Sequence, residues 1–245
     1  MDMAKSIYWI LVDRSQLPLE EAGSFLSSAE LQRLTSFRFP KRREEWLLGR
    51  WAAKSLARTL PEYRQFAPCE IEVRNSPEGW PYLCLPGADP APGCLSISHS
   101  HQFALAAMTF DLGIRVGVDL EKVEARANEF VEDYFTSRER GLVGSFPSEA
   151  RDMVSTLIWS TKESMLKALQ VGLRWDTRQV EVLQIQGLTP SQEQSRAWQG
   201  MQVGNPKPTG WHWAAWWQRR DDFLMTIVGM ASAPAELETV GLIEK

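Results

Sequence analysis

Residues 114–121 read Ile-Arg-Val-Gly-Val-Asp-Leu-Glu, a largely apolar run that closes on two acids. Its β-branched residues predict a strand over 114–120. Because successive side chains of a strand point to opposite faces, Asp119 and Glu121 lie on one face at its end. Two carboxylates at such a place suit Mg²⁺, which binds a few carboxylates together with phosphate and water oxygens. Two solvated acids at a strand terminus are also common, so the pair alone leaves both interpretations open.

Residues 159–167 read Trp-Ser-Thr-Lys-Glu-Ser-Met-Leu-Lys and fall within a helix that an apolar stripe predicts over 148–170. Glu163 and Lys167 are four residues apart, on one helix face and in the favourable order for a pair. They could form a plain surface ion pair. A capping box from Ser160 to Glu163 would need a helix that starts there, and the predicted helix starts well upstream.

The predicted helix over 40–60 carries a concentration of positive charge. Seven cations fall within 21 residues: Arg38, Lys41, Arg42, Arg43, Arg50, Lys54 and Arg58. Only Glu44 and Glu45 oppose them. A solvated helix face is the usual explanation of such a run. On a chain of net charge −4, the same cluster is also what an anionic, phosphorylated ligand would require.

Residues 96–101, Ser-Ile-Ser-His-Ser-His, hold two of the three histidines. In an extended strand His99 and His101 share one face and could ligate a metal, although no aspartate follows to complete an H-x-H-x-D pattern. A serine hydroxyl beside an imidazole can instead bind a phosphate. A solvated or hydrogen-bonded histidine explains the residues equally well.

Four blocks in one order resemble a known family. Leu-Leu-Gly-Arg at 47–50, Ser-Ile-Ser-His-Ser at 96–100, Gly-Val-Asp-Leu-Glu at 117–121 and the block at 159–167 resemble the 4′-phosphopantetheinyl transferases, whose signatures are G-[IV]-D-x-E and W-[ST]-x-K-E-[AS]-x-x-K. The length of 245 residues is similar to that of the larger, Sfp-type branch. The resemblance is thin after Leu173.

The resemblance implies an α+β fold of two similar halves, with the active site at their interface and a monomeric protein. We place the N-terminal half at 1–112 and the C-terminal half, with the metal-binding acids, at 113–245, because polar and glycine residues at 111–113 break two strand-like runs. No repeat is found at the level of residues. The other predicted elements are strands at 6–13, 69–74, 82–85, 94–99, 102–109, 179–185, 211–217 and 222–230, a short helix from 28 to about 36, and a long loop at 186–210.

The resemblance also implies the chemistry. Coenzyme A would be the donor substrate, Mg²⁺ the cofactor, and a serine of an apo acyl or peptidyl carrier protein the acceptor, with 3′,5′-ADP released. Asp119, Glu121 and Glu163 would bind the metal, and Glu163 with Lys167 would be catalytic. Lys162 and Lys167 match the signature lysines that contact coenzyme A, Lys167 being the closer match to a phosphate contact.

The remaining coenzyme A contacts come from the N-terminal half. By resemblance, Ser98 and His99 would hold the 3′-phosphate, and Arg43 and Arg50 would clamp the phosphates and the adenine side. Two features differ from the family pattern. Trp80 stands in Gly-Trp-Pro where the family often has Gly-Lys-Pro, and the acids Glu44 and Glu45 stand where a cation often precedes Leu-Leu-Gly.

Two alternative functions follow from the same residues. One is a non-catalytic module that binds coenzyme A or a carrier, motivated by Trp80. The other is a metal-dependent hydrolase that uses His99, His101 and Asp119. If carriers of fatty-acid, polyketide or peptide synthesis are modified, the sequence favours residues 124–146 as the surface that recognises them.

Composition narrows the class of protein. The net charge of −4 argues against a general nucleic-acid binder, which needs a basic footprint. Three cysteines are too few for a disulfide framework. No apolar stretch reaches the length of a membrane span, and the N-terminal apolar run predicts a strand rather than a signal peptide. We therefore expect a cytoplasmic protein without membrane or nucleic-acid partners.

Overall fold

The computed structural model describes residues 5–18, 21–111, 113–188, 197–205, 210–234 and 236–241. The chain divides into two compact units, Met1–Leu112 with Glu236–Lys245, and Gly113–Ala235. Both units mix helices with strands, which confirms the predicted α+β class. Within the described ranges, no helix has the length and apolar character needed to cross a membrane.

The first unit is built on a four-stranded sheet in the order β11-β1-β5-β4. Its strands are β1 (Lys5–Asp13), β4 (Cys94–Ser100), β5 (Phe103–Thr109) and β11 (Leu237–Gly241). β5 runs antiparallel to both β1 and β4, whereas β11 runs parallel to β1, with Lys5 opposite Leu237. The C-terminal strand is therefore an edge strand of the first unit, which differs from the predicted assignment of all of 113–245 to the second half.

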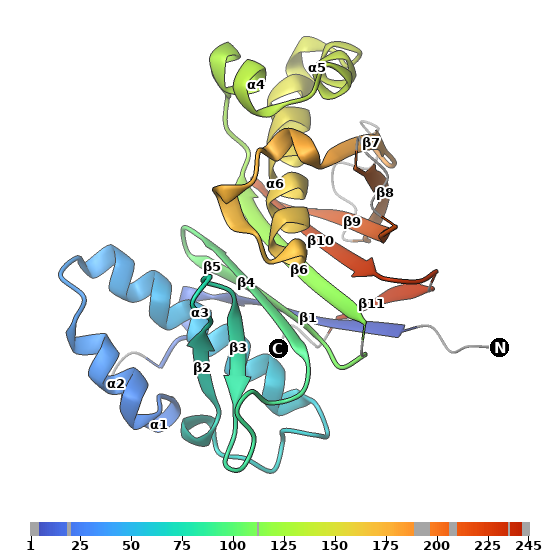
Figure 1. Cartoon of the computed structure of the whole chain (residues 1–245). Coiled ribbons are helices and arrows are strands. Elements are labelled where there is room, and N and C mark those ends of the chain that lie inside the picture. Colours follow the sequence, from blue (N-terminus) through green and yellow to red (C-terminus); the bar gives the residue numbers. More distant parts are fainter. Residues whose placement is uncertain are drawn as a thin grey trace. The chain divides into compact units, whose positions relative to one another are not determined.

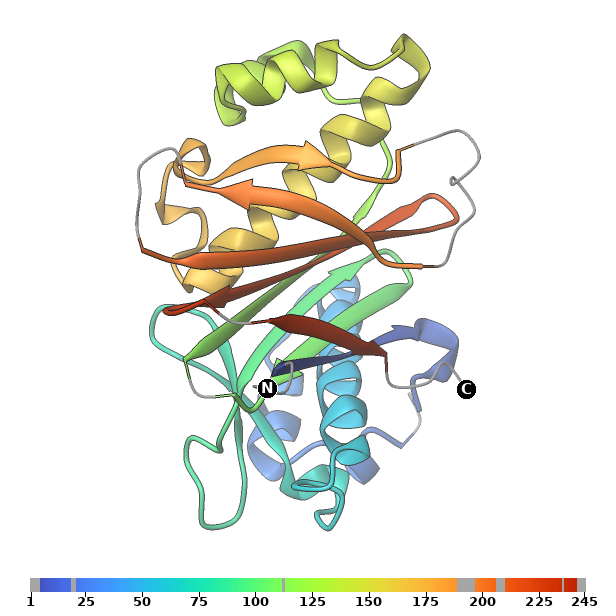
Figure 2. The same ribbon diagram turned by 90° about the vertical axis from the view of Figure 1, so that its right-hand side faces the viewer.

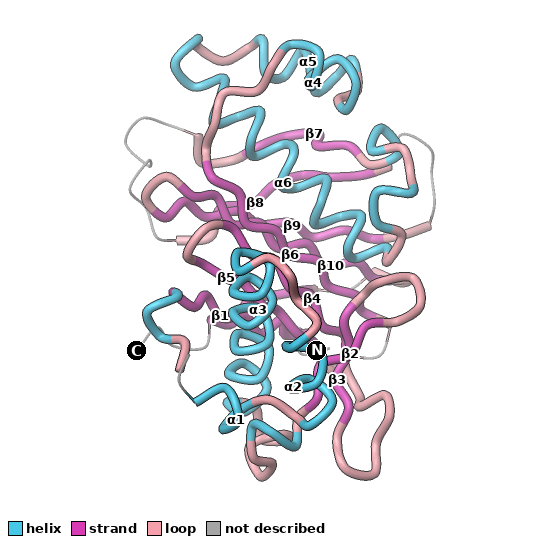
Figure 3. The backbone as a smooth tube through the Cα atoms, turned by 90° about the vertical axis from the view of Figure 1, so that its left-hand side faces the viewer, coloured by secondary structure: helices cyan, strands magenta, loops and turns pink. Residues whose placement is uncertain are grey.

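Helix α3 (Pro40–Thr59) covers one face of this sheet, in front of β1, β4 and β5 in Figure 3. Its apolar stripe enters the core through residues that are almost fully buried: Leu47, Leu48, Ala52, Ala53 and Leu56. Shorter elements complete the unit: α1 (Ala22–Phe25), α2 (Ser28–Thr35), and a hairpin of β2 (Glu72–Asn75) and β3 (Pro81–Cys84).

The second unit contains a five-stranded antiparallel sheet in the order β6-β10-β9-β8-β7. The strands are β6 (Ile114–Lys122), β7 (Glu181–Ile185), β8 (Gln199–Gly204), β9 (His212–Arg220) and β10 (Phe223–Ala231). Helix α6 (Arg151–Leu169) lies across one face of this sheet (Figures 1 and 2). Two short helices precede it, α4 (Asn128–Tyr134) and α5 (Ser137–Gly144).

Most predicted elements match, and two segments do not. Residues 186–210 were expected to form one long loop, but β8 occurs inside it, where Met201 is buried in the core and Gln202 beside it is exposed. Parts of that expected loop, 189–196 and 206–209, lie outside the described residues. The strand expected at 69–74 begins only at Glu72, because Pro68–Glu70 forms a 3₁₀ turn.

A buried lysine–glutamate pair connects the elements of the first unit. Lys54 of α3 forms an ion pair with Glu30 of α2, and both side chains are buried. Glu30 also accepts hydrogen bonds from the backbone N–H of Ser27 (2.8 Å) and of Val73 in β2 (3.0 Å). One carboxylate thus caps α2 and ties it to both α3 and β2.

The second unit contains the same device. Lys162 of α6 donates to Glu139 of α5 over 2.6 Å, and both side chains are fully buried. Glu139 accepts from the backbone N–H of Thr136 and of Val182 in β7, each over 2.9 Å. The capped helix α5, helix α6 and strand β7 therefore correspond to α2, α3 and β2 of the first unit.

These contacts reveal a repeat at the level of residues, so the expectation that none exists was wrong. Leu-Ser-Ser-Ala-Glu at 26–30 corresponds to Phe-Thr-Ser-Arg-Glu at 135–139, and Trp-Ala-Ala-Lys at 51–54 to Trp-Ser-Thr-Lys at 159–162. Too few positions are shared for composition or periodicity to reveal it. What the two units share is the buried ion pair and the cap that positions it.

Removal of either buried lysine should destabilise the protein strongly. Lys54→Ala and Lys162→Ala each leave a buried carboxylate without its cation, which costs about 3–5 kcal/mol of unfolding free energy. Lys41→Ala, whose side chain is 85% exposed, is the matched control and should cost less than about 0.5 kcal/mol. Urea unfolding followed by circular dichroism measures all three. Equal stability of Lys162→Ala and Lys41→Ala would contradict the structural role.

Candidate active site

Gly117 is the point of closest approach between α6 and β6. A Cβ atom built on Gly117 would lie 1.9 Å from the backbone oxygen of Ser164 and 2.6 Å from the backbone nitrogen of Ala168. No side chain fits there without a shift of the helix. The glycine of the Gly-Val-Asp-Leu-Glu block therefore sets the distance between helix and strand.

Small hydroxyl side chains attach the helix to the neighbouring strand. Ser164 Oγ lies 2.7 Å from Thr226 Oγ1 of β10, and Ser160 Oγ lies 3.0 Å from the same oxygen. All three residues are fully buried. Thr226 stands opposite Asp119 in the β6–β10 register, so this contact lies beside the predicted acids.

The predicted acids converge on this helix–strand contact. Asp119 and Glu121 share the face of β6 with Gly117, so they point toward α6, where Glu163 lies one residue before Ser164. Burial raises the pKa of Glu163, and the neighbouring charges of Asp119 and Glu121 raise it further, while Lys167 opposes the shift. Burial followed by the charge of Asp119 likewise raises the pKa of Glu121, against Arg126 and Lys167.

Lys167 and Arg126 partly neutralise this cluster. Lys167 donates to Asp119 Oδ1 over 2.8 Å and to the backbone oxygen of Val118 over 3.0 Å. Arg126 donates to Glu121 Oε2 over 3.2 Å, and its guanidinium lies 5.1 Å from the ring centre of Phe130. No sequence motif singles out Arg126, because it lies beyond the strand in a segment without regular structure.

The three carboxylates suit a hard cation that also binds oxygens from a phosphate or from water. Among the described residues, no group of three or more Asp, Glu, His or Cys side chains forms a complete metal site. Oε1 of Glu163 is nevertheless buried and accepts no hydrogen bond. Mg²⁺ is normally held by one or two carboxylates plus phosphate and water oxygens, so Asp119, Glu121 and Glu163 fit it as a partial ligand set.

Lys162 does not belong to this cluster, so its predicted role as a coenzyme A contact was wrong. Its side chain is fully buried, and its Nζ donates to Glu139 (2.6 Å) and to the backbone oxygen of Val180 (2.9 Å). Neighbouring positions on a helix point in different directions, so Lys162 faces α5 and β7 while Glu163 faces β6. The signature lysine is a structural residue here.

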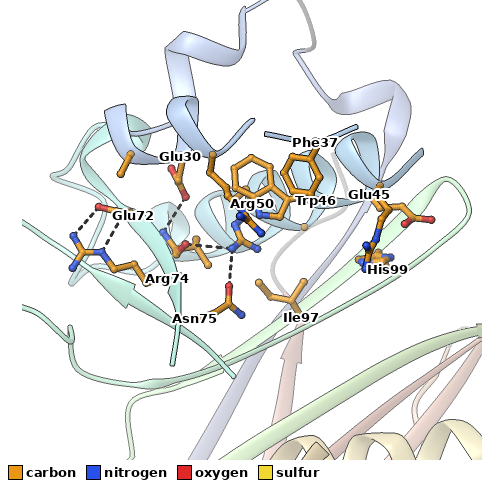
Figure 4. A pocket seen from close by; sticks show the side chains of 15 residues that line it. Glu30, Phe37, Glu45, Trp46, Arg50, Glu72, Arg74, Asn75, Ile97 and His99 are labelled. Atoms are coloured by element: carbon orange, nitrogen blue, oxygen red, sulfur yellow. Dashed lines mark hydrogen bonds and ion pairs between the residues drawn. The ribbon is translucent and has the colours of Figure 1, made fainter. Parts of the chain in front are cut away.

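The first unit contains a cavity of about 750 Å³ with several cations in its wall. Arg50 and His99 line it, as does Trp46, and Figure 4 shows these side chains around one space. Three further arginines line it: Arg42 of the predicted basic cluster, and Arg33 and Arg74, which no motif indicated. Of these, Arg74 is engaged by Glu72 and Asp89.

Arg50 is held rigidly within this wall. It donates to Asn75 Oδ1 (2.9 Å) and to the backbone oxygen of Val73 (3.4 Å), and its guanidinium lies 4.7 Å from the ring centre of Trp46. Burial lowers the pKa of Arg50 to about 10, despite the opposing charge of Glu30. The group stays protonated at neutral pH and is already oriented for an anion.

Two other predicted contacts lie elsewhere. Arg43 is exposed, and Arg42 takes its place among the residues that line the cavity. Ser98 is buried on the opposite face of β4 from Ile97 and His99, because side chains alternate along a strand. Only His99 of the predicted Ser-His pair therefore faces the cavity.

The histidine pair suggested for a hydrolase is not formed by a strand. β4 ends at Ser100, and His101 follows in a turn with φ +55°, so the alternation that would put His99 and His101 on one face stops there.

Comparisons with known proteins agree with the motifs. Residues 115–228 match the family model described as the 4′-phosphopantetheinyl transferase superfamily. The chain is 29% identical over 189 residues to 4′-phosphopantetheinyl transferase HetI of a Nostoc species, covering 76% of this chain and 75% of that protein. It is also 29% identical to 4′-phosphopantetheinyl transferase pptA of Paxillus involutus, covering 79% of each. These matches confirm the predicted family resemblance.

Among solved structures, a holo-(acyl-carrier-protein) synthase from Bacillus anthracis, in complex with CoA (3′,5′-ADP), is 24% identical with a TM-score of 0.36. The match covers 42% of this chain and 91% of that one.

Gly117→Ala should damage the contact between α6 and β6. The added methyl group must displace the helix backbone, which costs about 1–3 kcal/mol or more and moves Glu163 away from Asp119. Gly141→Ala in α5, where a Cβ meets nothing within 4 Å, is the control and should be neutral or stabilising. Thermal unfolding measures both. Equal melting temperatures of the two variants would contradict the close approach.

Glu163→Gln should stabilise the metal-free protein at neutral pH. Because the folded-state pKa of Glu163 lies above its usual value, the folded protein binds the proton more tightly, and stability falls as the pH rises through that window. Glutamine removes this penalty, so its advantage should be small near pH 4.5 and larger at pH 7. Melting temperatures in a chelating buffer at both pH values measure the difference. A variant less stable than the wild type at pH 7 would contradict the assignment.

Proposed function

We propose that this chain, whose residues 115–228 match the 4′-phosphopantetheinyl transferase superfamily, transfers 4′-phosphopantetheine from coenzyme A to a serine of an apo carrier protein. The observation that carries the proposal is the convergence of Asp119, Glu121 and Glu163 with Lys167 at the contact of β6 and α6. Three acids and one amine at one point suit the handling of a pyrophosphate and a divalent cation. The proposal assigns the chain to the two-half branch of the family, active as a monomer.

The reaction is a phosphoryl transfer. The carrier serine oxygen forms a bond to the β-phosphorus of coenzyme A, and the bond from that phosphorus to the bridging oxygen breaks, so that 3′,5′-ADP leaves with the electron pair. A carboxylate must accept the serine proton, and Glu163 is suited because its raised pKa brings it closer to neutral pH. Lys167, on the same helix face, can stabilise the charge on the transferring oxygens.

Mg²⁺, held by Asp119, Glu121 and Glu163, would supply neutralisation of the charge on the pyrophosphate and the leaving group. Lys167 partly neutralises the charge of Asp119. Arg126 opposes the rise in the pKa of Glu121 that burial and Asp119 cause, and so favours the ionised form that a metal ligand requires. We infer from these contacts that Lys167 and Arg126 offset part of the repulsion among the acids until a divalent cation binds.

The cavity of the first unit is the proposed site for the phosphorylated end of coenzyme A. His99 and Arg50 line it together with Arg33 and Arg42. Trp46 offers an aromatic surface beside these cations, which suits a nucleoside phosphate.

The free thiols of the cysteines are compatible with the cytoplasmic location that we propose.

The transfer itself is directly measurable. With coenzyme A and Mg²⁺, the protein should add one phosphopantetheine mass to an apo acyl or peptidyl carrier protein, as seen by intact-mass spectrometry. Asp119→Asn and Glu163→Gln should lower the rate by at least about a hundredfold while circular dichroism stays unchanged. Glu149→Gln, an exposed acid, is the matched control and should keep full activity.

Three results would refute the proposal. Near-normal transfer by Asp119→Asn or Glu163→Gln would remove the acids from the mechanism. Coenzyme A binding in calorimetry, without transfer to several unrelated carriers, would favour the non-catalytic module. Activity on a phosphoester that survives withdrawal of Mg²⁺ but not a zinc-selective chelator would favour the hydrolase.

A further inference from the structure

The start of α3 presents an exposed aromatic side chain. Phe39 is 67% exposed, the largest exposed fraction among the large apolar residues of the described chain. It occupies the N-cap position of α3, makes no capping hydrogen bond through its side chain, and is followed by Pro40. Neither its packing nor its position in the helix explains a phenylalanine there.

Cations flank this phenylalanine in the sequence. Arg38, Lys41, Arg42 and Arg43 are all exposed, and no acid occurs between positions 38 and 43. Lys41 lies 3.9 Å from Glu45, and among the described residues no ion pair engages Arg38, Arg42 or Arg43. We call residues 38–43 the basic knob.

The basic knob contradicts the local preferences of a helix. Helix N-termini favour acids and capping side chains, because the backbone N–H groups there carry partial positive charge. The chain follows this preference elsewhere: Ser27 with Glu30 and Thr136 with Glu139 form capping boxes for α2 and α5. α3 instead places three cations in its first turn, which is expected only where another function requires them.

The knob adjoins the proposed coenzyme A cavity within the first unit. Arg42 belongs to the knob and lines the cavity, as does Phe37 just before it. Phe39 and Arg38 do not line the cavity. A coenzyme A phosphate can therefore explain Arg42, but it does not explain the exposed ring or the remaining cations.

The segment first expected to bind the carrier has the opposite charge. Residues 124–146 contain five acids and three arginines. Of the arginines, Arg126 is engaged by Glu121, and the exposed part of α4 carries Glu129, Glu132 and Asp133. An acidic partner would be repelled from α4 and attracted to the knob.

We propose that the basic knob, with Phe39 as its apolar anchor, is the docking surface for an acidic carrier protein. The inference rests on the proposed function, because it names where the acceptor substrate binds. An exposed aromatic anchor with neighbouring cations matches a partner that offers a small apolar pocket beside carboxylates. The attraction would also raise the rate of encounter at low salt.

The test uses an apo acyl carrier protein as substrate. Each variant of the basic knob is compared with a control that makes the same change of charge, or removes an exposed ring, elsewhere in the chain. Phe39→Ala and Arg38→Glu should each raise the KM for the carrier at least tenfold while the KM for coenzyme A changes less than twofold. Arg58→Glu, an exposed cation roughly 25 Å further along α3, makes the same change in net charge and should have less than a twofold effect. Trp175→Ala, a 40% exposed ring in the second unit, is the control for Phe39→Ala.

Direct binding makes the result independent of turnover. The Kd of a fluorescently labelled apo acyl carrier protein, measured by anisotropy, should rise in parallel with its KM in both knob variants. If the wild type binds the carrier through the knob but transfers nothing, the proposed function fails and the docking surface stands.

Three outcomes would overturn the docking surface. Unchanged carrier Kd in Phe39→Ala and Arg38→Glu would exclude the knob. An equal loss in Arg58→Glu would show general charge attraction, and a rise in the KM for coenzyme A alone would assign the knob to the donor. Wild-type binding to vesicles of phosphatidylserine and phosphatidylcholine that Phe39→Ala abolishes, with unchanged carrier Kd, would identify a membrane surface instead.

Discussion

The backbone of α6 approaches β6 so closely that position 117 has no room for a side chain. Much of the candidate site depends on this one contact. Because strand and helix touch there, residues two and four positions further along the strand face the helix turn that carries Glu163 and Lys167. Ser160 and Ser164 hold α6 close to β10 as well, through hydrogen bonds to Thr226. The site is thus held by backbone packing rather than by a preformed set of metal ligands.

Such packing allows an unfavourable cluster of charge to persist. Three carboxylates at one place repel one another, and burial makes each charge more costly, as the raised pKa values of Glu121 and Glu163 indicate. The stability that tolerates this comes from elsewhere in the unit, above all from its apolar core. A bound cation would relieve the repulsion, so the site is suited to bind one.

Periodicity and capping residues predicted the helices and strands in which these signals are strong. They could not predict contacts between residues that are far apart in the sequence. The strand with Asp119 and the long helix with Glu163 follow from local pattern. The role of Lys162 could not, because its partner Glu139 lies 23 residues away on another helix. Arg42 and Arg43 are adjacent cations that no pattern distinguishes, and only the packed helix shows which one lines the cavity.

The internal repeat separates the structural part of the signature from the chemical part. Aligned on the buried lysines, Trp51 corresponds to Trp159 and Lys54 to Lys162, and each lysine pairs with a glutamate of a capping box. In the same alignment Glu163 and Lys167 correspond to Ser55 and Thr59, which carry no charge. Residues common to both units therefore serve the fold that the units share. Glu163 and Lys167, which are present in the second unit only, are the ones whose presence the fold does not explain and a reaction must.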